Sequence, residues 1–337
     1  MENRVDPKYP VRVVIVSMFD GESGIWAERM PLQTTVSFPH GYRDLSYDPE
    51  RQLLKVVTGV GTAKAAASIM ALGLDHRFDL SRAYWIVAGI AGGNPNTISV
   101  GSAAWAEWIV DGDLAHEIDP REIPAAWSTG RLPLFRKEPF EKPVGESLGE
   151  AYRLDPGLVD WAYELTKGIS LEDSEDLRLL RGQYTAHQAA QDSPRVMKGD
   201  SISGSTLWHG KLMNEWAEQW VDYWSEGRAI FVTTAMEDTG ILQALTLLDR
   251  GGFSDFRRVL VLRSVCNYSM QPSHMSAPES LAREGKSAYS AFKPALDSVF
   301  VVASRVVLEI VDNWETYSVS VPSGRFGTLP LKRPEGC

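Results

Sequence analysis

Cysteine is scarce in this sequence, because only two of its 337 residues are cysteines, Cys266 and Cys337. A disulfide framework needs several pairs of cysteines, and a cysteine-based metal site needs a cluster of them. Both are therefore excluded. No spacing of the other potential ligands indicates a metal site either, and we expect the protein to use no metal and no cofactor.

Long apolar runs are also missing. The apolar runs have the length of β-strands, and none approaches the roughly 18–20 residues that a helix needs to cross a bilayer. Residues 1–10 lack the apolar core of a signal peptide. We therefore expect no membrane span, and a protein that is cytoplasmic, or exported if a leader has been removed.

Positive charge is in deficit, with 34 Lys and Arg residues against 44 Asp and Glu residues and a formal net charge of −10. Nucleic acids and anionic membrane surfaces attract basic proteins, because the phosphates need compensating cations. The charge balance therefore argues against a nucleic acid or an anionic membrane as the main partner.

The remaining composition, with 44% hydrophobic and 23% charged residues, is that of an ordinary globular protein. The length suits one large domain or two small ones. Runs that are apolar almost throughout are typical of strands in sheets that are covered on both faces. Strands are predicted at residues 11–16, 53–57, 84–88, 103–110, 229–232 and 258–262, and helices at 65–74, 158–165, 174–180, 211–224, 241–248 and 292–311. Residues 111–156 carry many Pro and Gly residues and are predicted to form an irregular surface excursion.

Two adjacent carboxylates, Glu237 and Asp238, follow the strand predicted at residues 229–232 and precede a helix. In open α/β sheets, ligands bind beyond the carboxyl ends of the strands. Two carboxylates at such a place can accept hydrogen bonds from a vicinal diol, such as the 2′- and 3′-hydroxyls of a ribose. The alternative is that both residues simply favour the positive end of the helix dipole.

Carboxylates and glycines follow other predicted strands. Asp20 and Glu22 lie in a Gly-containing segment that we expect to be a turn, in which they either hold a water or a sugar hydroxyl or are merely solvated. The strand at 84–88 ends in small residues that include Gly92 and Gly93. Small residues at a strand end indicate close packing or close approach of the backbone to a ligand.

Two segments carry groups that suit a flat ring. Residues 195–210 hold a Gly/Ser run that ends in Trp208 and His209. Trp208 either offers an aromatic face to a ring or follows a turn as a buried residue. The strand at 258–262 leads to Asn267, whose amide both donates and accepts and so suits the N7/O6 edge of a purine, unless it only forms a turn.

Taken in order, these segments resemble those of the purine nucleoside phosphorylase/nucleosidase superfamily, and more closely those of the purine nucleoside permease family. The resemblance spans about residues 11–315. It rests on Val-Ser-Met-Phe-Asp-Gly-Glu (16–22), Thr-Gly-Val-Gly-Thr (58–62), Val-Ala-Gly-Ile-Ala-Gly (87–92), Arg-Glu-Ile-Pro-Ala (121–125), Thr-Thr-Ala-Met-Glu-Asp (233–238) and Arg-Ser-Val-Cys-Asn-Tyr (263–268).

The resemblance implies a single domain over residues 1–337, folded as a three-layer α/β/α sandwich around a mixed β-sheet. It also implies that Met236 and Glu237 hold the ribose and that Asn267 engages the base and helps it leave. The Gly-rich stretch near residues 89–93 would lie beside the sugar and the base. Glu22, and less directly Asp20, would face the attacking nucleophile. Members of the superfamily are usually oligomers, so we expect a homo-oligomer.

The sequence departs from the phosphorylase pattern where phosphate would bind. Phosphorylases hold phosphate with arginines after the first strand and before the Gly/Ser stretch, but residues 18–24 contain no Arg and residues 85–93 contain neither Arg nor Ser. A phosphate dianion needs compensating cations or several backbone donors. Glu22 would instead suit a water nucleophile as its general base. Arg29 and Arg43 are the two arginines that could still reach inward.

We therefore predict a purine nucleosidase, which converts a purine ribonucleoside and water into free base and ribose. In this hypothesis Glu237, with Asp238, binds the ribose, Asn267 holds the base, Glu22 orients water, and Trp208 or Tyr268 stacks on the ring. Two alternatives stay open: a phosphate-dependent purine nucleoside phosphorylase, and a non-catalytic nucleoside-binding or uptake protein. The family name implies transport, yet without a membrane span the chain cannot itself conduct nucleosides through hydrocarbon.

Overall fold

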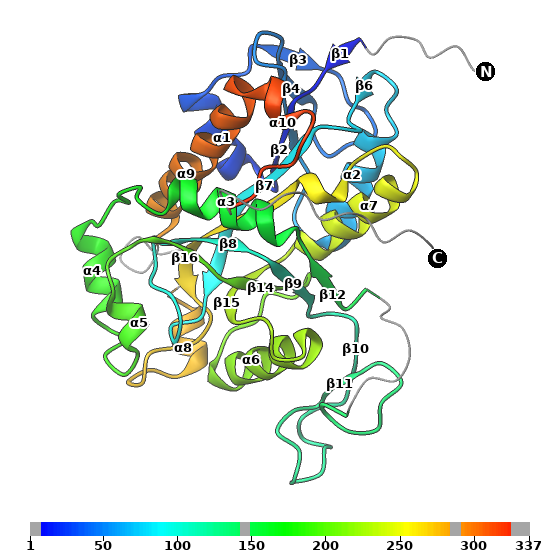
Figure 1. Cartoon of the computed structure of the whole chain (residues 1–337). Helices are drawn as coiled ribbons and strands as arrows, with labels where there is room; N and C mark the ends of the chain where they lie inside the picture. Colours follow the sequence, from blue (N-terminus) through cyan, green and yellow to red (C-terminus); the bar gives the residue numbers. More distant parts are fainter. Residues whose placement is uncertain (1–7, 142–148, 284–290, 325–337) are drawn as a thin grey trace.

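The computed structural model describes residues 8–141, 149–283 and 291–324. One large mixed β-sheet forms the centre of the molecule, and helices pack on both of its faces (Figure 1). The predicted fold class, a three-layer α/β/α sandwich around a mixed sheet, is confirmed.

Most of the predicted strands occur in this sheet, in which buried Val, Ile and Leu side chains cover both faces. Its main path runs through β12 (Ala151–Arg153), β9 (Trp108–Asp111), β14 (Asp200–Ser203), β15 (Phe231–Ala235), β7 (Tyr84–Gly93), β2 (Val13–Ser17), β5 (Leu53–Val57), β4 (Leu45–Asp48) and β3 (Thr34–Val36). Three more strands join it beside this path: β16 (Val259–Tyr268), β8 (Ala103–Ala106) and β13 (Val196–Lys198).

Strand β7 is the hub of the sheet. It pairs in parallel with β2 and with β16, and its last residues Gly92 and Gly93 pair antiparallel with Thr234 and Thr233 of β15. The carboxyl ends of β2, β7 and β16 therefore meet at one edge of the sheet, which is where α/β proteins bind their ligands.

Two helical layers cover the sheet. On one side α1 (Asp20–Arg29) and α3 (Pro156–Thr166) pack against α9 (Phe292–Asp312), and α9 lies on β16, β7 and β2. The other layer contains α2 (Thr62–Gly73) and α7 (Asp238–Arg250), which pack tightly together (Figure 1). The remaining helices are α4 (Glu175–Arg181), α5 (Gln188–Gln191), α6 (Lys211–Ser225), the short 3-10 helix η1 (Phe256–Arg258), α8 (Ala277–Leu281) and α10 (Trp314–Tyr317).

Residues 20–24 form the first half of helix α1, so the prediction of a turn at Asp20 and Glu22 was wrong. Acidic residues favour the first turn of a helix, where they meet the positive end of its dipole. Trp26 is fully buried and anchors this helix edge-on against Phe300 of α9, with ring centroids 5.0 Å apart. This helix was not predicted from the sequence because it contains Gly21 and Gly24, and Gly disfavours helix interiors.

The single strand predicted at residues 103–110 is two strands, β8 and β9, interrupted at Glu107. The carboxylate of Asp200 accepts hydrogen bonds from the backbone N–H groups of Glu107 (3.1 Å) and Trp108 (2.8 Å) at this break. Strand β8 then pairs with β16 and β13, while β9 pairs with β14 and β12.

The Gly/Ser segment at residues 195–210 also contains two strands, β13 and β14, that the sequence pattern did not indicate. The excursion at residues 111–156 carries β10 (Ala115–Glu117), β11 (Arg131–Pro133) and β12 among its described residues. Strands β10 and β11 pair only with each other and project from the body to the lower right of α6 (Figure 1). A second small sheet pairs β1 (Tyr9–Pro10) with β6 (Phe78–Asp79).

Candidate functional site

A cavity of about 280 Å³ lies where β2, β7, β15 and β16 end, which is near the lower end of the size range of small-molecule sites. Its polar lining residues are Glu22, Thr234, Glu237, Arg263, Cys266 and Asn267. Its other lining residues are apolar or Gly: Met18, Phe19, Val60, Ile90, Ala91, Gly92, Leu207, Ala235, Met236 and Phe292. A largely apolar cavity with a few convergent polar groups is the form that small-molecule sites usually take.

Glu22 is held in this cavity by two backbone groups. Its carboxylate accepts hydrogen bonds from the N–H of Met18 (2.7 Å) and from the N–H of Ile90 in β7 (2.8 Å). Burial raises the pKa of Glu22 to about 7, against the opposing effects of Arg263 and of these two donors. A carboxyl group with a pKa near neutrality can both take up and release a proton, as a general base requires.

Arg263 joins the carboxylates of Glu237 and Asp238 into a buried charged cluster. Its Nε donates to Oδ1 of Asp238 at 3.1 Å, and its Nη2 donates to Oε2 of Glu237 at 3.2 Å. Burial works against the charge of Arg263, but Asp238 and Glu237 raise its pKa further above the usual range. Burial also raises the pKa of Glu237. The guanidinium group of Arg263 is thus already hydrogen-bonded to two carboxylates.

Glycines bring the backbone close to this cluster. Gly61, with a φ of +98°, lies in the turn before α2, and its N–H donates to Oε1 of Glu237 at 3.3 Å. Such a φ favours Gly over other residues. In β7, a Cβ on Gly89 would lie 2.5 Å from Oε1 of Glu22 and 2.7 Å from Nη1 of Arg263. Close approach of the backbone is therefore built into two of the predicted Gly-containing segments.

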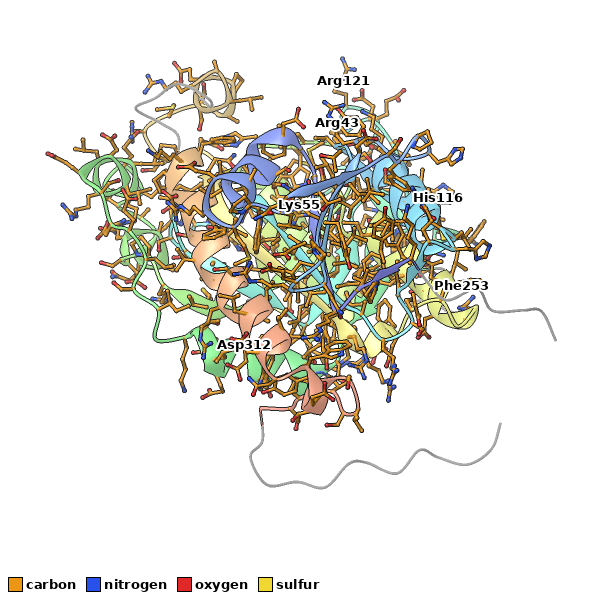
Figure 2. All side chains as sticks on the ribbon, turned by 90° about the horizontal axis from the view of Figure 1, so that it is seen from above. Arg43, Lys55, His116, Arg121, Phe253 and Asp312 are labelled. Carbon is orange, nitrogen blue, oxygen red and sulfur yellow. The ribbon has the colours of Figure 1, made fainter. Side chains whose placement is uncertain are left out.

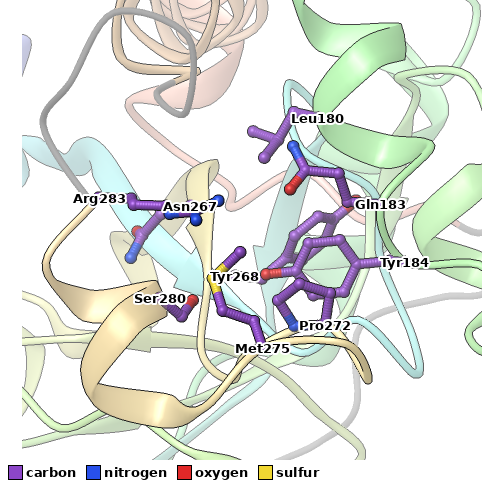
Figure 3. Close-up of a pocket in the computed structure, with 9 residues that line it drawn as sticks. All are labelled: Leu180, Gln183, Tyr184, Asn267, Tyr268, Pro272, Met275, Ser280 and Arg283. Carbon is purple, nitrogen blue, oxygen red and sulfur yellow. The ribbon is translucent and has the colours of Figure 1, made fainter.

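Asn267, near the end of β16, lines this cavity and also a second, smaller one of about 20 Å³ (Figure 3). The second cavity lies between β16 and the segments around α4 and α8, and Tyr268 lines it. The hydroxyl of Tyr268 donates to the carbonyl of Ala190 at 2.7 Å and accepts from the N–H of Val100 at 3.2 Å. Tyr268 therefore lies outside the larger cavity, as part of the packing behind it.

The structure brings together only some of the predicted site residues. Glu22, Gly92, Met236, Glu237 and Asn267 all line the larger cavity. Asp238 is fully buried behind it as the partner of Arg263, and Gly93 is occupied in the pairing of β7 with β15.

Asp20 and Trp208 point elsewhere. The side chain of Asp20 is 69% exposed and forms an ion pair with Arg43 at 3.1 Å. Arg43 lies at the periphery of the molecule (Figure 2). Trp208 packs against Trp216 of α6 and Phe231 of β15, with ring centroids 6.3 and 6.1 Å away. Its neighbour Leu207 lines the cavity instead.

No role for Arg263 was predicted from the sequence. A signal was present, because an arginine directly after the apolar run 259–262 must find charged partners if the strand is buried. The apolar lining residues Phe19, Val60 and Phe292 gave no signal, since scattered apolar residues are equally suited to a core. They are recognised as part of a site only because the three segments that carry them line the same cavity in the folded structure.

Arg29 and Arg43, the two arginines named as able to reach inward, do not line the cavity. Arg29 pairs with Asp297 of α9 at 2.5 Å, and Arg43 pairs with Asp20. Among the described residues that line the cavity, Arg263 is the only cationic one. The described part of the chain also shows no group of three or more His, Cys, Asp or Glu residues that could hold a metal ion. Within the same part, no helix combines the length and the apolar character needed to cross a membrane.

Solved structures that share this architecture include proteins named as nucleosidases or hydrolases. A 5′-methylthioadenosine/S-adenosylhomocysteine nucleosidase of Campylobacter jejuni matches 90% of this chain and 99% of its own, with 12% identity and a TM-score of 0.54. The Streptococcus pneumoniae enzyme of the same name, solved with 8-aminoadenine, matches 92% of this chain and 100% of its own, with 12% identity and a TM-score of 0.52. A futalosine hydrolase of Helicobacter pylori matches 90% of this chain and 98% of its own, with 14% identity and a TM-score of 0.51. At these identities the likeness shows the shared fold.

Relatives by sequence carry a different name. A purine nucleoside permease of Candida albicans is 27% identical over 313 residues, which cover 91% of this chain and 76% of the relative. A probable purine nucleoside permease of Schizosaccharomyces pombe is 28% identical over 320 residues, which cover 91% of each chain. The family model described as purine nucleoside permease matches residues 10–322. This chain therefore belongs to the purine nucleoside permease family.

Proposed function

We propose that this protein is a purine nucleosidase, which hydrolyses the N-glycosidic bond of purine ribonucleosides to free base and ribose. The observation that carries the proposal is the presence of Glu22, Glu237 and Asn267 in one cavity, at the carboxyl end of the sheet. Each of the three groups suits a different part of a nucleoside: the attacking water, the ribose hydroxyls and the base. The fold shared with nucleosidases supports the same assignment.

The chemistry follows from the three positions. Glu22 takes a proton from a water molecule as the water oxygen attacks the anomeric carbon of the ribose. The bond between that carbon and the purine nitrogen breaks, and its electron pair leaves with the base, which then takes up a proton. Glu237 accepts hydrogen bonds from the ribose hydroxyls, and its negative charge favours the positive charge that develops on the sugar. Asn267 donates a hydrogen bond to the base as negative charge builds on it.

Hydrolysis fits the cavity better than phosphorolysis because no uncommitted cation is available for phosphate among the described lining residues. Arg263 already forms hydrogen bonds with Asp238 and Glu237, and the nearby carboxyl group of Glu22 adds negative charge whenever it is ionised. A phosphate dianion placed there would face carboxylates without a free arginine to offset them. Water carries no such charge.

The name of the sequence relatives favours a second candidate, a nucleoside-binding protein that supports uptake without catalysis. The same cavity would serve it, since ribose and base contacts do not require a general base. This candidate predicts saturable binding of a purine nucleoside and no release of base.

The deciding experiment is incubation of the purified full-length chain with inosine or adenosine, with and without phosphate, followed by chromatography of base and sugar. Free ribose and base without phosphate support the nucleosidase. Base and ribose 1-phosphate only when phosphate is present would mean a phosphorylase. Binding without any base release would favour the uptake protein, and unchanged hydrolysis in both Glu237→Ala and Asn267→Ala variants would overturn the assigned roles.

A further inference from the structure

The proposed reaction does not use the Gly/Ser run at residues 203–206, which begins at the last residue of strand β14. Ser203 is fully buried, and its Oγ accepts a hydrogen bond from the N–H of Thr239 in the first turn of α7 at 3.3 Å. The Oγ of Ser205 accepts a hydrogen bond from the N–H of Thr62, the first residue of α2, at 3.0 Å. One short segment therefore contacts the N-terminal ends of two helices.

Neither helix has a side-chain cap of its own. The N-cap residue of α2 is Gly61, which has no side chain, and the N-cap residue of α7 is Glu237, whose side chain makes no capping hydrogen bond. The first N–H groups of a helix have no partner within the helix, and a Ser hydroxyl is among the best acceptors for them. Ser205 and Ser203 therefore supply, from the end of β14, the caps that α2 and α7 lack.

The two helix ends that are capped in this way meet beside the larger cavity. The N–H of Gly61 donates to Oε1 of Glu237 at 3.3 Å, so the N-cap residues of the two helices are hydrogen-bonded to each other. A Cβ on Gly240 of α7 would lie 2.2 Å from the carbonyl oxygen of Thr62 in α2, because the first turns of the two helices pack in direct contact. The direction of the Glu237 carboxylate therefore depends on the positions at which both helices begin.

The Gly/Ser run is itself anchored on both sides. The N–H of Gly204 donates to the carbonyl of Ala235 in β15 at 3.1 Å, and the N–H of Ser205 donates to Oδ2 of Asp113 at 2.5 Å. A Cβ on Gly204 would lie 2.6 Å from Oδ1 of Asp113, so this carboxylate fits closely against the backbone of the run. These contacts tie the run to β15, the strand that leads to Glu237.

We infer that Ser203 and Ser205 are positioning residues, which cap α7 and α2 and thereby hold the carboxylate of Glu237 in the direction in which it accepts hydrogen bonds from the ribose. This inference rests on the proposed binding of a purine nucleoside in the cavity. Neither serine is among the described residues that line the larger cavity, so each acts through the helix that it caps. The two hydroxyls should therefore matter for a nucleoside, which carries the ribose, but not for the free base.

The test compares Ser205→Ala with Ser205→Thr in the full-length chain, with inosine as substrate and hypoxanthine as the inhibiting product. In Ser205→Ala we expect kcat/KM for inosine to fall about tenfold, because hydrogen bonds to the charged Glu237 are weakened. The inhibition constant of hypoxanthine should stay unchanged. Ser205→Thr should restore kcat/KM, since a Thr hydroxyl also caps a helix and residue 205 is exposed enough for the added methyl group. Ser203→Ala should reproduce the selective loss through α7.

A matched control separates this positioning role from the general loss of a helix cap. Ser174 caps α4, where its Oγ accepts a hydrogen bond from the N–H of Leu177 at 3.4 Å. Ser174→Ala should leave both kcat/KM and the inhibition constant unchanged. Thermal unfolding of each variant is measured as well, because a general destabilisation would weaken inosine turnover and hypoxanthine binding together. Unchanged turnover in Ser205→Ala and Ser203→Ala, an equal loss for inosine and hypoxanthine, or no restoration in Ser205→Thr would overturn the inference.

Binding measurements separate this inference from the proposed hydrolysis. If the parent protein releases no base, titration calorimetry with inosine and with hypoxanthine replaces the kinetic assay. Inosine binding that weakens in Ser205→Ala while hypoxanthine binding does not would support the positioning role, although the nucleosidase would then have failed. Normal hydrolysis by all the serine variants would uphold the nucleosidase and contradict the positioning role. No binding of inosine by the parent protein would contradict both.

Discussion

At the scale of single residues, the environment of Glu22 differs strongly from that of an ordinary surface carboxylate. It is 1% exposed, and both of its oxygens accept backbone N–H groups. These donors partly replace the water that burial removes, but the pKa still rises to about 7, mainly through burial. The carboxyl group is therefore ready to exchange a proton at neutral pH.

Replacement of Glu22 by Gln should abolish most of the hydrolysis. The amide cannot take a proton from water, and a general base of this kind contributes about 10²–10⁴-fold to a rate. Glu28→Gln, on the exposed side of the same helix, is the control and should keep the parent rate. Steady-state release of base from a purine nucleoside measures both. A Glu22→Gln rate within about threefold of the parent would exclude this residue as the base.

The pH dependence of the reaction follows from the same group. Glu22 acts as a base only when ionised, and its pKa is raised to about 7. We therefore expect kcat/KM to rise with pH and to level off above neutrality, with a fall of about tenfold per pH unit on the acid side. The measurement is the rate of the parent protein as a function of pH from about 5 to about 9, which is roughly two pH units on either side of this pKa. A flat profile would contradict the role of Glu22.

Arg263 holds the charged cluster together from a position that is 1% exposed. Arg263→Met leaves the buried carboxylates of Glu237 and Asp238 without their partner, which should lower the free energy of unfolding by about 3–5 kcal/mol. Arg257→Met removes a pair to Asp255 whose arginine is 62% exposed, so its effect should stay within about 1 kcal/mol. Denaturant titration of both variants measures the difference, and equal losses would show that the cluster adds no special stability.

At the scale of secondary-structure elements, the site depends on how closely β7 approaches α1 and β16. Glu22 comes from α1, Arg263 comes from β16, and Gly89 of β7 lies against both. Neither side chain is free to retreat, because each is buried and hydrogen-bonded. Because Gly89 has no side chain, Glu22 of α1 and Arg263 of β16 can both lie against β7 at this position.

Gly89→Ala should therefore damage both the fold and the site. The new Cβ would lie 2.5 Å from Glu22 and 2.7 Å from Arg263, and overpacking of this kind costs about 1–3 kcal/mol. Gly24→Ala in α1 is the matched control, since a Cβ there meets nothing within 4 Å. It should raise stability by about 0.5–1 kcal/mol, because Ala favours a helix over Gly. Thermal unfolding and base release are measured for both, and a fully active Gly89→Ala protein would disprove the tight contact.

At the scale of the whole molecule, the buried carboxyl group of Glu22 links stability to pH. Its pKa in the folded protein is about 7, compared with 4.5 for the unperturbed group, so the folded state holds its proton more tightly than the unfolded state. The stabilisation from this group is therefore fully present below about pH 4.5 and is lost as the pH rises toward 7.

The corresponding measurement is the free energy of unfolding of the parent protein and of Glu22→Gln across this pH window. The difference between the two should change by up to about 1.4 kcal/mol per pH unit, the parent protein becoming less stable relative to the variant as the pH rises. Parallel stability curves would show that Glu22 does not hold a raised pKa.

Homo-oligomerisation, which the family resemblance implies, stays a prediction that light scattering of the same samples can test.

Much of the fold was accessible from local sequence pattern. The strand predicted at residues 53–57 is β5, the helix at 292–311 is α9 with one more residue, and the helix at 174–180 is α4, with Ser174 as its N-cap. Helix α1 was missed because Gly21 and Gly24 mask its helical character, and the break between β8 and β9 was missed because Asp200 makes it from a distant segment. Local sequence patterns predict an element correctly when its own residues determine its structure. They fail when a contact with a distant segment determines it.

The sequence by itself determined the α/β class, the family and the positions at which strands end in polar groups. These follow from hydrophobic pattern and motif order, which are properties of neighbouring residues. Only the tertiary structure decided that Glu22, Glu237 and Asn267 share a cavity, whereas Asp20 and Trp208 lie outside it. One physical reason is that the direction of a side chain depends on its position around a helix, or on a β-bulge such as the register shift at Cys266 in β16. The other is that partners such as Arg263 and Asp238 meet only when the sheet and its helices pack together.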